Sequence, residues 1–132
     1  MDIREFLTKM IKAEIKRNER ATEEERERQE LRSKKFKIMP KKTGHITKPS
    51  EYADIPDELF GDPVNYKYPI DPEHLIIAIR YFNHSKQRVA GGYTDKEWEI
   101  IGNRIANRTN GKYIYKDGKI IRAEKRQEGG DK

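Results

Sequence analysis

The chain of 132 residues contains no cysteine, which excludes disulfides, cysteine nucleophiles and thiolate metal sites. It also lacks long apolar runs. None approaches the roughly 18 residues of a membrane-spanning helix, and the charged first 15 residues do not resemble a secretory signal, so we expect a soluble protein. Hydrophobic residues make up only 33% of the chain, below the roughly 45–50% usual in globular proteins when glycine is counted. Part of the chain should therefore contribute little to a core.

Charge is what the chain has in abundance, at 39% of residues and a formal net charge of +6. Residues 1–50 carry the whole excess, with 15 Lys/Arg against 9 Asp/Glu, whereas residues 51–132 carry 14 of each. Residues 31–50 contain bases and no acid, and residues 51–73 are strongly acidic. Such a pattern indicates binding to nucleic acid, or pairing within the chain or with another copy. The Glu, Lys and Arg content also fits a thermophile.

Residues 2–32 are predicted to be helical, with apolar side chains recurring at three- and four-residue steps over the first four turns. This N-terminal stripe consists of Ile3, Phe6, Leu7, Met10, Ile11 and Ile15. It ends at Ile15, and residues 16–30 contain no large apolar side chain. We expect residues 1–32 to form a charged helix that binds a protein partner, or another copy of the chain, through the stripe. A mobile, solvated arm is the alternative.

The rest of the chain divides into a linker, a folded unit and a tail. Residues 33–50 contain prolines, a glycine and many lysines, and are predicted to be a basic linker that does not pack. Residues 51–122 are predicted to be the folded unit, in which the proline-rich segment 51–70 wraps over a core. Residues 123–132 are predicted to be a polar tail.

Two helices within residues 51–122 have clear sequence signals. Asp71 is an N-cap residue, and Pro72 suits the first helical position, where its missing N–H costs nothing. The helix that follows is apolar on much of its circumference and is expected to be substantially buried. Thr94 and Glu97 form a capping box for the second helix, which should end at Asn110-Gly111.

A β-hairpin is predicted at the end of the folded unit. The strands 112–116 and 119–122 flank Asp117-Gly118, a dipeptide that suits a tight two-residue turn. The predicted fold class is therefore α+β and mainly helical: a compact two-helix domain with a small C-terminal hairpin, preceded by a long charged N-terminal helix.

The sequence offers little for catalysis. His74 and His84 are about 15 Å apart along one helix, so they do not share a metal ion, and His45 lies in the linker. None of the three serines lies in a nucleophile elbow. We expect no enzymatic activity, no catalytic residue, no metal, no cofactor and no small-molecule or membrane partner.

Nucleic-acid binding is the alternative function. Helix, connection, helix and hairpin is the element order of a winged helix-turn-helix, although the connection near residues 84–94 exceeds the usual three or four residues. Lysine and arginine neutralise phosphates, and asparagine and arginine read base edges. The candidate residues on the 94–109 helix and the 112–122 hairpin are Lys96, Asn103, Arg104, Asn107, Arg108, Lys112, Lys116 and Lys119.

One stretch of the sequence resembles a known module. Its residues are Gly61-Asp62-Pro63, Tyr68-Pro69-Ile70-Asp71, His74, Ala78, Tyr81-Phe82-Asn83, Tyr93, Glu97 and Arg104-Ile105. Over about residues 60–106 they resemble a small phage- and prophage-encoded module of unknown function, found with head-assembly and maturation-protease proteins. The resemblance ends after Ala106. It implies a phage setting, in the host cytoplasm or the virion, and no catalytic residues. The leading hypothesis is a non-enzymatic binding or assembly module that docks through its N-terminal helix.

Overall fold

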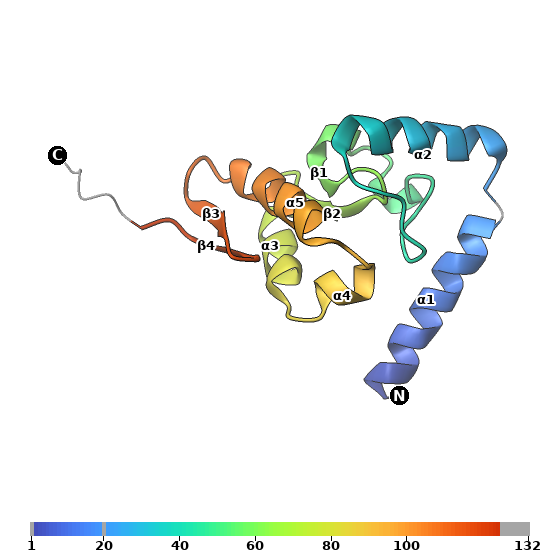
Figure 1. The fold of residues 1–132 in the computed structure, drawn as a ribbon, viewed down its shortest axis with the longest axis horizontal. Coiled ribbons are helices and arrows are strands. Elements are labelled where there is room, and N and C mark those ends of the chain that lie inside the picture. Colours follow the sequence, from blue (N-terminus) through green and yellow to red (C-terminus); the bar gives the residue numbers. More distant parts are fainter. Residues whose placement is uncertain (1, 20, 125–132) are drawn as a thin grey trace.

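The computed structural model describes residues 2–19 and 21–124 of the chain (Figure 1). Its helices are α1 (Ile3–Glu19), α2 (Glu23–Phe36), α3 (Leu75–Asn83), α4 (Gln87–Gly91) and α5 (Asp95–Asn107), with 3-10 turns at Ser50–Tyr52 and Asp57–Leu59. Its strands are β1 (Phe60–Asp62), β2 (Lys67–Pro69), β3 (Tyr113–Lys116) and β4 (Lys119–Arg122). The strands form two antiparallel pairs, β1–β2 and β3–β4. The fold is α+β, as the sequence predicts.

No helix in the described ranges is long and apolar enough to cross a membrane. Most of the predicted polar tail, residues 125–132, lies outside the described residues.

Residues 2–32 form two helices where the sequence pattern predicts one. Asp2 caps α1 by accepting the backbone N–H of Arg4 at 2.9 Å. Thr22 starts α2 with a second capping box, in which Thr22 and Glu25 each accept the other's backbone N–H. Since a capping residue has extended backbone (φ −74°, ψ 165°), Thr22 separates the helices, and α2 continues beyond residue 32 to Phe36.

The segment 33–50, predicted to be a linker outside the core, packs against the folded unit. Ile38 is fully buried in the main core. The backbone N–H of Lys41 donates to Asn65 Oδ1 at 2.7 Å, and a Cβ added to Gly44 would lie 2.3 Å from the same oxygen. The prediction is wrong here because the charge of the lysines says little about the backbone between them, which is hydrogen-bonded. The Lys41 and Lys48 ammonium groups are themselves paired with carboxylates of the folded unit, at 2.7 and 3.0 Å.

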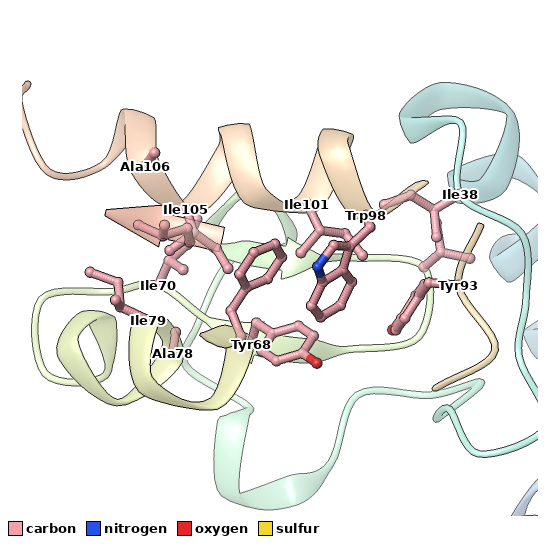
Figure 2. Close-up of a cluster of buried hydrophobic side chains, with 13 residues drawn as sticks. Ile38, Tyr68, Ile70, Ala78, Ile79, Tyr93, Trp98, Ile101, Ile105 and Ala106 are labelled. Carbon is pink, nitrogen blue, oxygen red and sulfur yellow. The ribbon is translucent and has the colours of Figure 1, made fainter. Parts of the chain in front are cut away.

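The main core is built on aromatic stacking between α3 and α5 (Figure 2). The Phe82 ring stacks on Trp98 with centroids 3.9 Å apart and an interplanar angle of 7°. Tyr68 and Tyr93 pack against the indole at 6.0 and 5.5 Å. Trp98 Nε1 donates to the carbonyl of Gly118 at 3.0 Å, which ties the hairpin turn to the core. The aliphatic core residues are Ile38, Val64, Ile70, Ile79, Ile101, Ile105 and Ile120.

The burial of α3 is one-sided, which corrects the expectation of a substantially buried helix. Ala78, Ile79 and Phe82 are buried, whereas Ile76, Ile77 and Tyr81 are 51%, 44% and 59% exposed. Helices α4 and α5 and strands β2 and β4 contact α3, and Ile76, Ile77 and Tyr81 remain exposed despite these contacts. An apolar face of α3 therefore remains at the surface.

The β3–β4 hairpin forms as predicted. Lys116 pairs with Lys119, and Asp117 and Gly118 between them have φ values of 51° and 86°, as a two-residue type I′ turn requires. Asn83 at the end of α3 holds the outer edge of β4. Its side chain donates to the carbonyl of Ile120 and accepts the N–H of the same residue, both at 2.8 Å.

Replacement of Ile38 tests whether the 33–50 segment belongs to the core. Ile38→Ala is expected to lower the free energy of unfolding by about 2–5 kcal/mol, since it removes buried methyl groups and leaves a cavity. Met39→Ala is the matched control, because Met39 is 62% exposed, and its effect should stay within about 0.5 kcal/mol. Urea denaturation measures both. Equally small effects would show that Ile38 does not pack.

Candidate functional site

The turn between β1 and β2 contains a buried carboxylate at the centre of a polar network. Asp62 has no exposed surface. Its carboxylate accepts the backbone N–H groups of Val64 and Asn65 at 3.0 and 3.1 Å, the Asn65 side-chain amide at 2.9 Å and the Tyr93 hydroxyl at 2.5 Å. Burial raises the pKa of Asp62, while these four hydrogen bonds oppose the rise.

Helix α2 is attached to the same turn through side-chain donors. Arg32 donates to the carbonyls of Pro63, Val64 and Ile46 at 2.8, 3.1 and 2.8 Å, and Gln29 donates to Val64 at 3.2 Å. The Arg32 guanidinium also lies 4.4 Å from the centre of the Tyr66 ring, a cation–π contact. These bonds satisfy carbonyl groups that the irregular turn leaves without sheet partners.

Glu97 joins the start of α5 to the 33–50 segment. Its carboxylate completes the predicted capping box by accepting the N–H of Thr94 at 2.9 Å. It also accepts the N–H of Met39 at 2.8 Å and the ammonium of Lys41 at 2.7 Å. Burial pushes the pKa of Glu97 upward, but the hydrogen bonds outweigh burial and the pKa is lowered. The capping residue therefore also anchors a distant segment.

The residues that carry the resemblance to the phage module have partners inside the fold. Besides Asp62, Tyr93 and Glu97, His74 contacts the Asp71 carboxylate at 2.8 Å, and the Tyr68 hydroxyl donates to Gln87 at 2.7 Å. These contacts give the motif a structural role. Among the described residues, no three histidines or acids lie close enough together to hold a metal ion.

Arg104, one of the residues proposed to contact nucleic acid, is bound to the protein's own backbone. Its guanidinium donates to the carbonyl of Phe60 at 2.8 and 3.1 Å and to that of Glu58 at 3.0 Å. It also lies over the Phe36 ring at 4.7 Å. Reading a base edge would require Arg104 to break these contacts.

The other residues of the nucleic-acid alternative lie mostly at the surface. Asn103 and Asn107 on α5 are exposed, as are Lys112 and Lys116 on and beside β3. Three residues have contacts within the chain: Lys96 with Glu99, Arg108 with the carbonyl of Ile70, and Lys119 with the carbonyl of Asn83, each at 3.5 Å. The structure thus leaves an exposed basic hairpin beside a helix whose central arginine is engaged.

A groove lies between α1 and the folded unit, apart from a larger hollow of about 480 Å³ that α2 and the 33–50 segment line. It consists of two adjoining hollows of about 260 and 160 Å³, which share Met10, Lys67, Tyr68 and Gln87 as lining residues. We call it the tyrosine groove. Its remaining lining residues are Leu7, Thr43, His45, Tyr52, Tyr66, Pro69, His74, Ile77, Ala78, Tyr81, Ala90, Gly91 and Tyr93.

The N-terminal stripe lies at the open side of this groove. Figure 1 shows α1 apart from α3 and α5 and joined to them through α2. Leu7 and Met10 line the groove but are still 45% and 46% exposed, and Ile3 and Phe6 are 71% and 53% exposed. The side chains of the other two stripe residues, Ile11 and Ile15, lie outside the described residues.

The stripe and the outer face of α3 both expose apolar side chains, and Leu7, Met10, Ile77 and Tyr81 of these line the groove. The seven large side chains that α1 and α3 expose are Ile3, Phe6, Leu7, Met10, Ile76, Ile77 and Tyr81. At about 200 Å² for each residue, the area that large aromatic side chains bury, their exposed fractions add up to on the order of 700 Å² over the two helices. This surface is therefore the candidate binding site.

Removal of the Tyr93 hydroxyl tests the buried network. Because folding raises the pKa of Asp62, the contribution of this carboxyl to stability falls as the pH rises through the raised pKa. The Tyr93 hydroxyl counteracts that loss by donating to the carboxylate. Tyr93→Phe should therefore lower the free energy of unfolding by about 1.5–3 kcal/mol at neutral pH, and by less near pH 4, where Asp62 is increasingly protonated.

Urea denaturation at the two pH values measures this difference. Tyr81→Phe is the control, because Tyr81 is 59% exposed and should show little effect at either pH. An equal cost for Tyr93→Phe at both pH values would mean that the hydroxyl does not act on the ionised carboxylate.

Comparisons with known proteins were made at the level of families, individual sequences and structures. No protein-family model matches the chain, and neither a curated protein nor a solved structure matches it.

Proposed function

We propose that the chain is a non-enzymatic protein-binding module that docks on a protein partner through the N-terminal stripe. The observation that carries this proposal is the apolar surface on α1 and α3, on the order of 700 Å² by the side-chain areas used above. Aromatic side chains and methionine are enriched in protein interfaces, and this surface contains Phe6, Met10 and Tyr81. In this proposal a charged N-terminal helix presents the stripe beside a compact domain.

The proposed setting is the assembly of phage heads. Its support is the resemblance of residues 60–106 to a module found with head-assembly and maturation-protease proteins. The contacts of Asp62, Tyr93 and Glu97 agree with this proposal in one respect. The residues that carry the resemblance maintain the fold, so that recognition of a partner is left to the apolar side chains at the surface. The N-terminal arm, which has no counterpart in the resemblance, then supplies the specificity for a partner.

Nucleic-acid binding by α5 and the hairpin has weaker support. Arg104, the central arginine of the candidate helix, is held by the carbonyls of Phe60 and Glu58. Protein binding relies on apolar contact and changes little with salt, whereas phosphate binding weakens steeply as salt rises. Salt dependence therefore separates the two functions.

Pairwise binding to a panel of purified phage head-assembly proteins tests the proposal. The double variant Phe6→Glu/Leu7→Glu should weaken binding at least tenfold, because truncation of interface anchors commonly costs more than about 1–2 kcal/mol. Biolayer interferometry on purified proteins gives the dissociation constants at 50 and 300 mM salt. Lys9→Gln, on the polar side of the same helix, is the control and should bind as the wild type does.

Two results would contradict the proposal. One is that the wild-type chain binds none of these proteins while retarding DNA or RNA in a salt-dependent way. The other is that the double variant binds its partner as tightly as the wild type. Thermal unfolding of the double variant should match that of the wild type, since both replaced side chains are about half-exposed.

A further inference from the structure

We propose that the tyrosine groove receives helix α1 of a second copy of the chain, so that two chains form a closed dimer by inserting their stripes reciprocally. This inference rests on the proposed function, because it names the partner on which the N-terminal stripe docks. It assigns the groove as the receiving surface and the stripe as the inserted one.

The groove has the size needed for the side chains of an amphipathic helix. Its hollows measure about 260 and 160 Å³, and an apolar cavity of about 150 Å³ accommodates a benzene-sized group. The hollows adjoin, and helices that bind in grooves insert anchors from positions i, i+3, i+4 and i+7. Ile3, Phe6, Leu7 and Met10 have this spacing, so two or three of them can enter the groove together.

Within the described residues of a single chain, neither the groove nor the apolar side of α1 is covered. The chain's own α1 contributes only Leu7 and Met10 to the groove lining, and both remain nearly half exposed. Ile3 and Phe6 are more exposed still. No other described helix presents four large apolar side chains on one face with 45% or more of each exposed. A single chain therefore has both an unfilled groove and an uncovered helix that fits it.

The available area matches that of a stable dimer. Each chain offers on the order of 700 Å² of apolar surface on α1 and α3, and each partner of a standard protein interface contributes about 800 Å². Because a two-fold interface uses the same surface twice, one helix inserted in each direction covers the exposed side chains of both copies. A single inserted helix would leave half of this surface in water.

The N-terminal connection allows the exchange without disturbing the domain. Helix α2 is fastened to the β1–β2 turn by Arg32 and Gln29. Ala21 and Thr22 between α1 and α2 are non-helical, so α1 projects from a fixed base on a short connection. Exchange of a terminal element on such a connection is a low-cost route to a dimer.

A complementation experiment tests this arrangement. The stripe variant Ile3→Glu/Phe6→Glu, at two stripe residues that do not line the groove, and the groove variant Ile77→Glu/Tyr81→Glu are each purified as the full chain. Light scattering coupled to size exclusion, and sedimentation velocity, give the molecular mass over a concentration series. The wild type should dimerise, each variant alone should be monomeric or at least tenfold weaker, and an equimolar mixture of the two should form a heterodimer.

The mixture restores one contact because the groove variant supplies an intact helix and the stripe variant an intact groove. This result also shows that both variants are folded. Val89→Glu is the matched control, since Val89 is an exposed apolar residue on α4 (82%) that does not line the groove. It should dimerise as the wild type does.

Three outcomes would overturn the proposal. The first is a wild-type chain that stays monomeric at about 100 µM. The second is a groove variant that dimerises normally, which would indicate that α1 pairs with α1. The third is a mixture of the two variants that stays monomeric. A monomeric wild type that still binds a phage head protein through Phe6 and Leu7 would reject the dimer alone. The proposed function itself fails only if the stripe binds no protein at all.

Discussion

The hydrogen bonds of the buried Asp62 carboxylate are the interaction on which the arrangement of this chain depends. A carboxylate without exposed surface is costly unless donors surround it, and here the donors come from separate parts of the chain. Val64 and Asn65 belong to its own turn, and Tyr93 follows α4. Asn65 in turn receives the backbone N–H of Lys41. One acid thereby fixes the β1–β2 turn, the start of α5 and the basic segment against one another.

The hydrogen bonds around Asp62 explain how the highly charged 33–50 segment packs against a small core. The 33–50 segment contributes Ile38 to the hydrophobic interior and its backbone to Asn65 and Glu97. The apolar surface that this segment buries is small, and its polar contacts fix the position of the segment. A chain with 33% hydrophobic residues thus gains order from satisfied polar groups as well as from buried area.

Two elements with local signals were predictable from the sequence, whereas the predicted cap at Asp71 was wrong: α3 begins at Leu75, with His74 in the N-cap position. The capping box at Thr94 and the Asp117-Gly118 turn depend on residues within four positions of each other, and both form as expected. The burial of Ile38 and the exposed face of α3 depend on what packs there from distant segments, which periodicity does not reveal. The tyrosine groove was missed for the same reason, because its walls come from several elements. The unusual number of tyrosines in residues 51–70 was the one available signal.

The hydrogen bonds of Asn83 and Thr109 have a consequence for how this molecule meets others. A two-stranded hairpin has two open edges whose free N–H and C=O groups can pair with strands of other chains. Asn83 occupies both backbone groups of Ile120 on β4, and the Thr109 hydroxyl accepts the N–H of Tyr113 on β3. These side chains work against open-ended growth by strand addition. At Ile120 and Tyr113 the backbone groups that a further strand would need are therefore already paired within the chain.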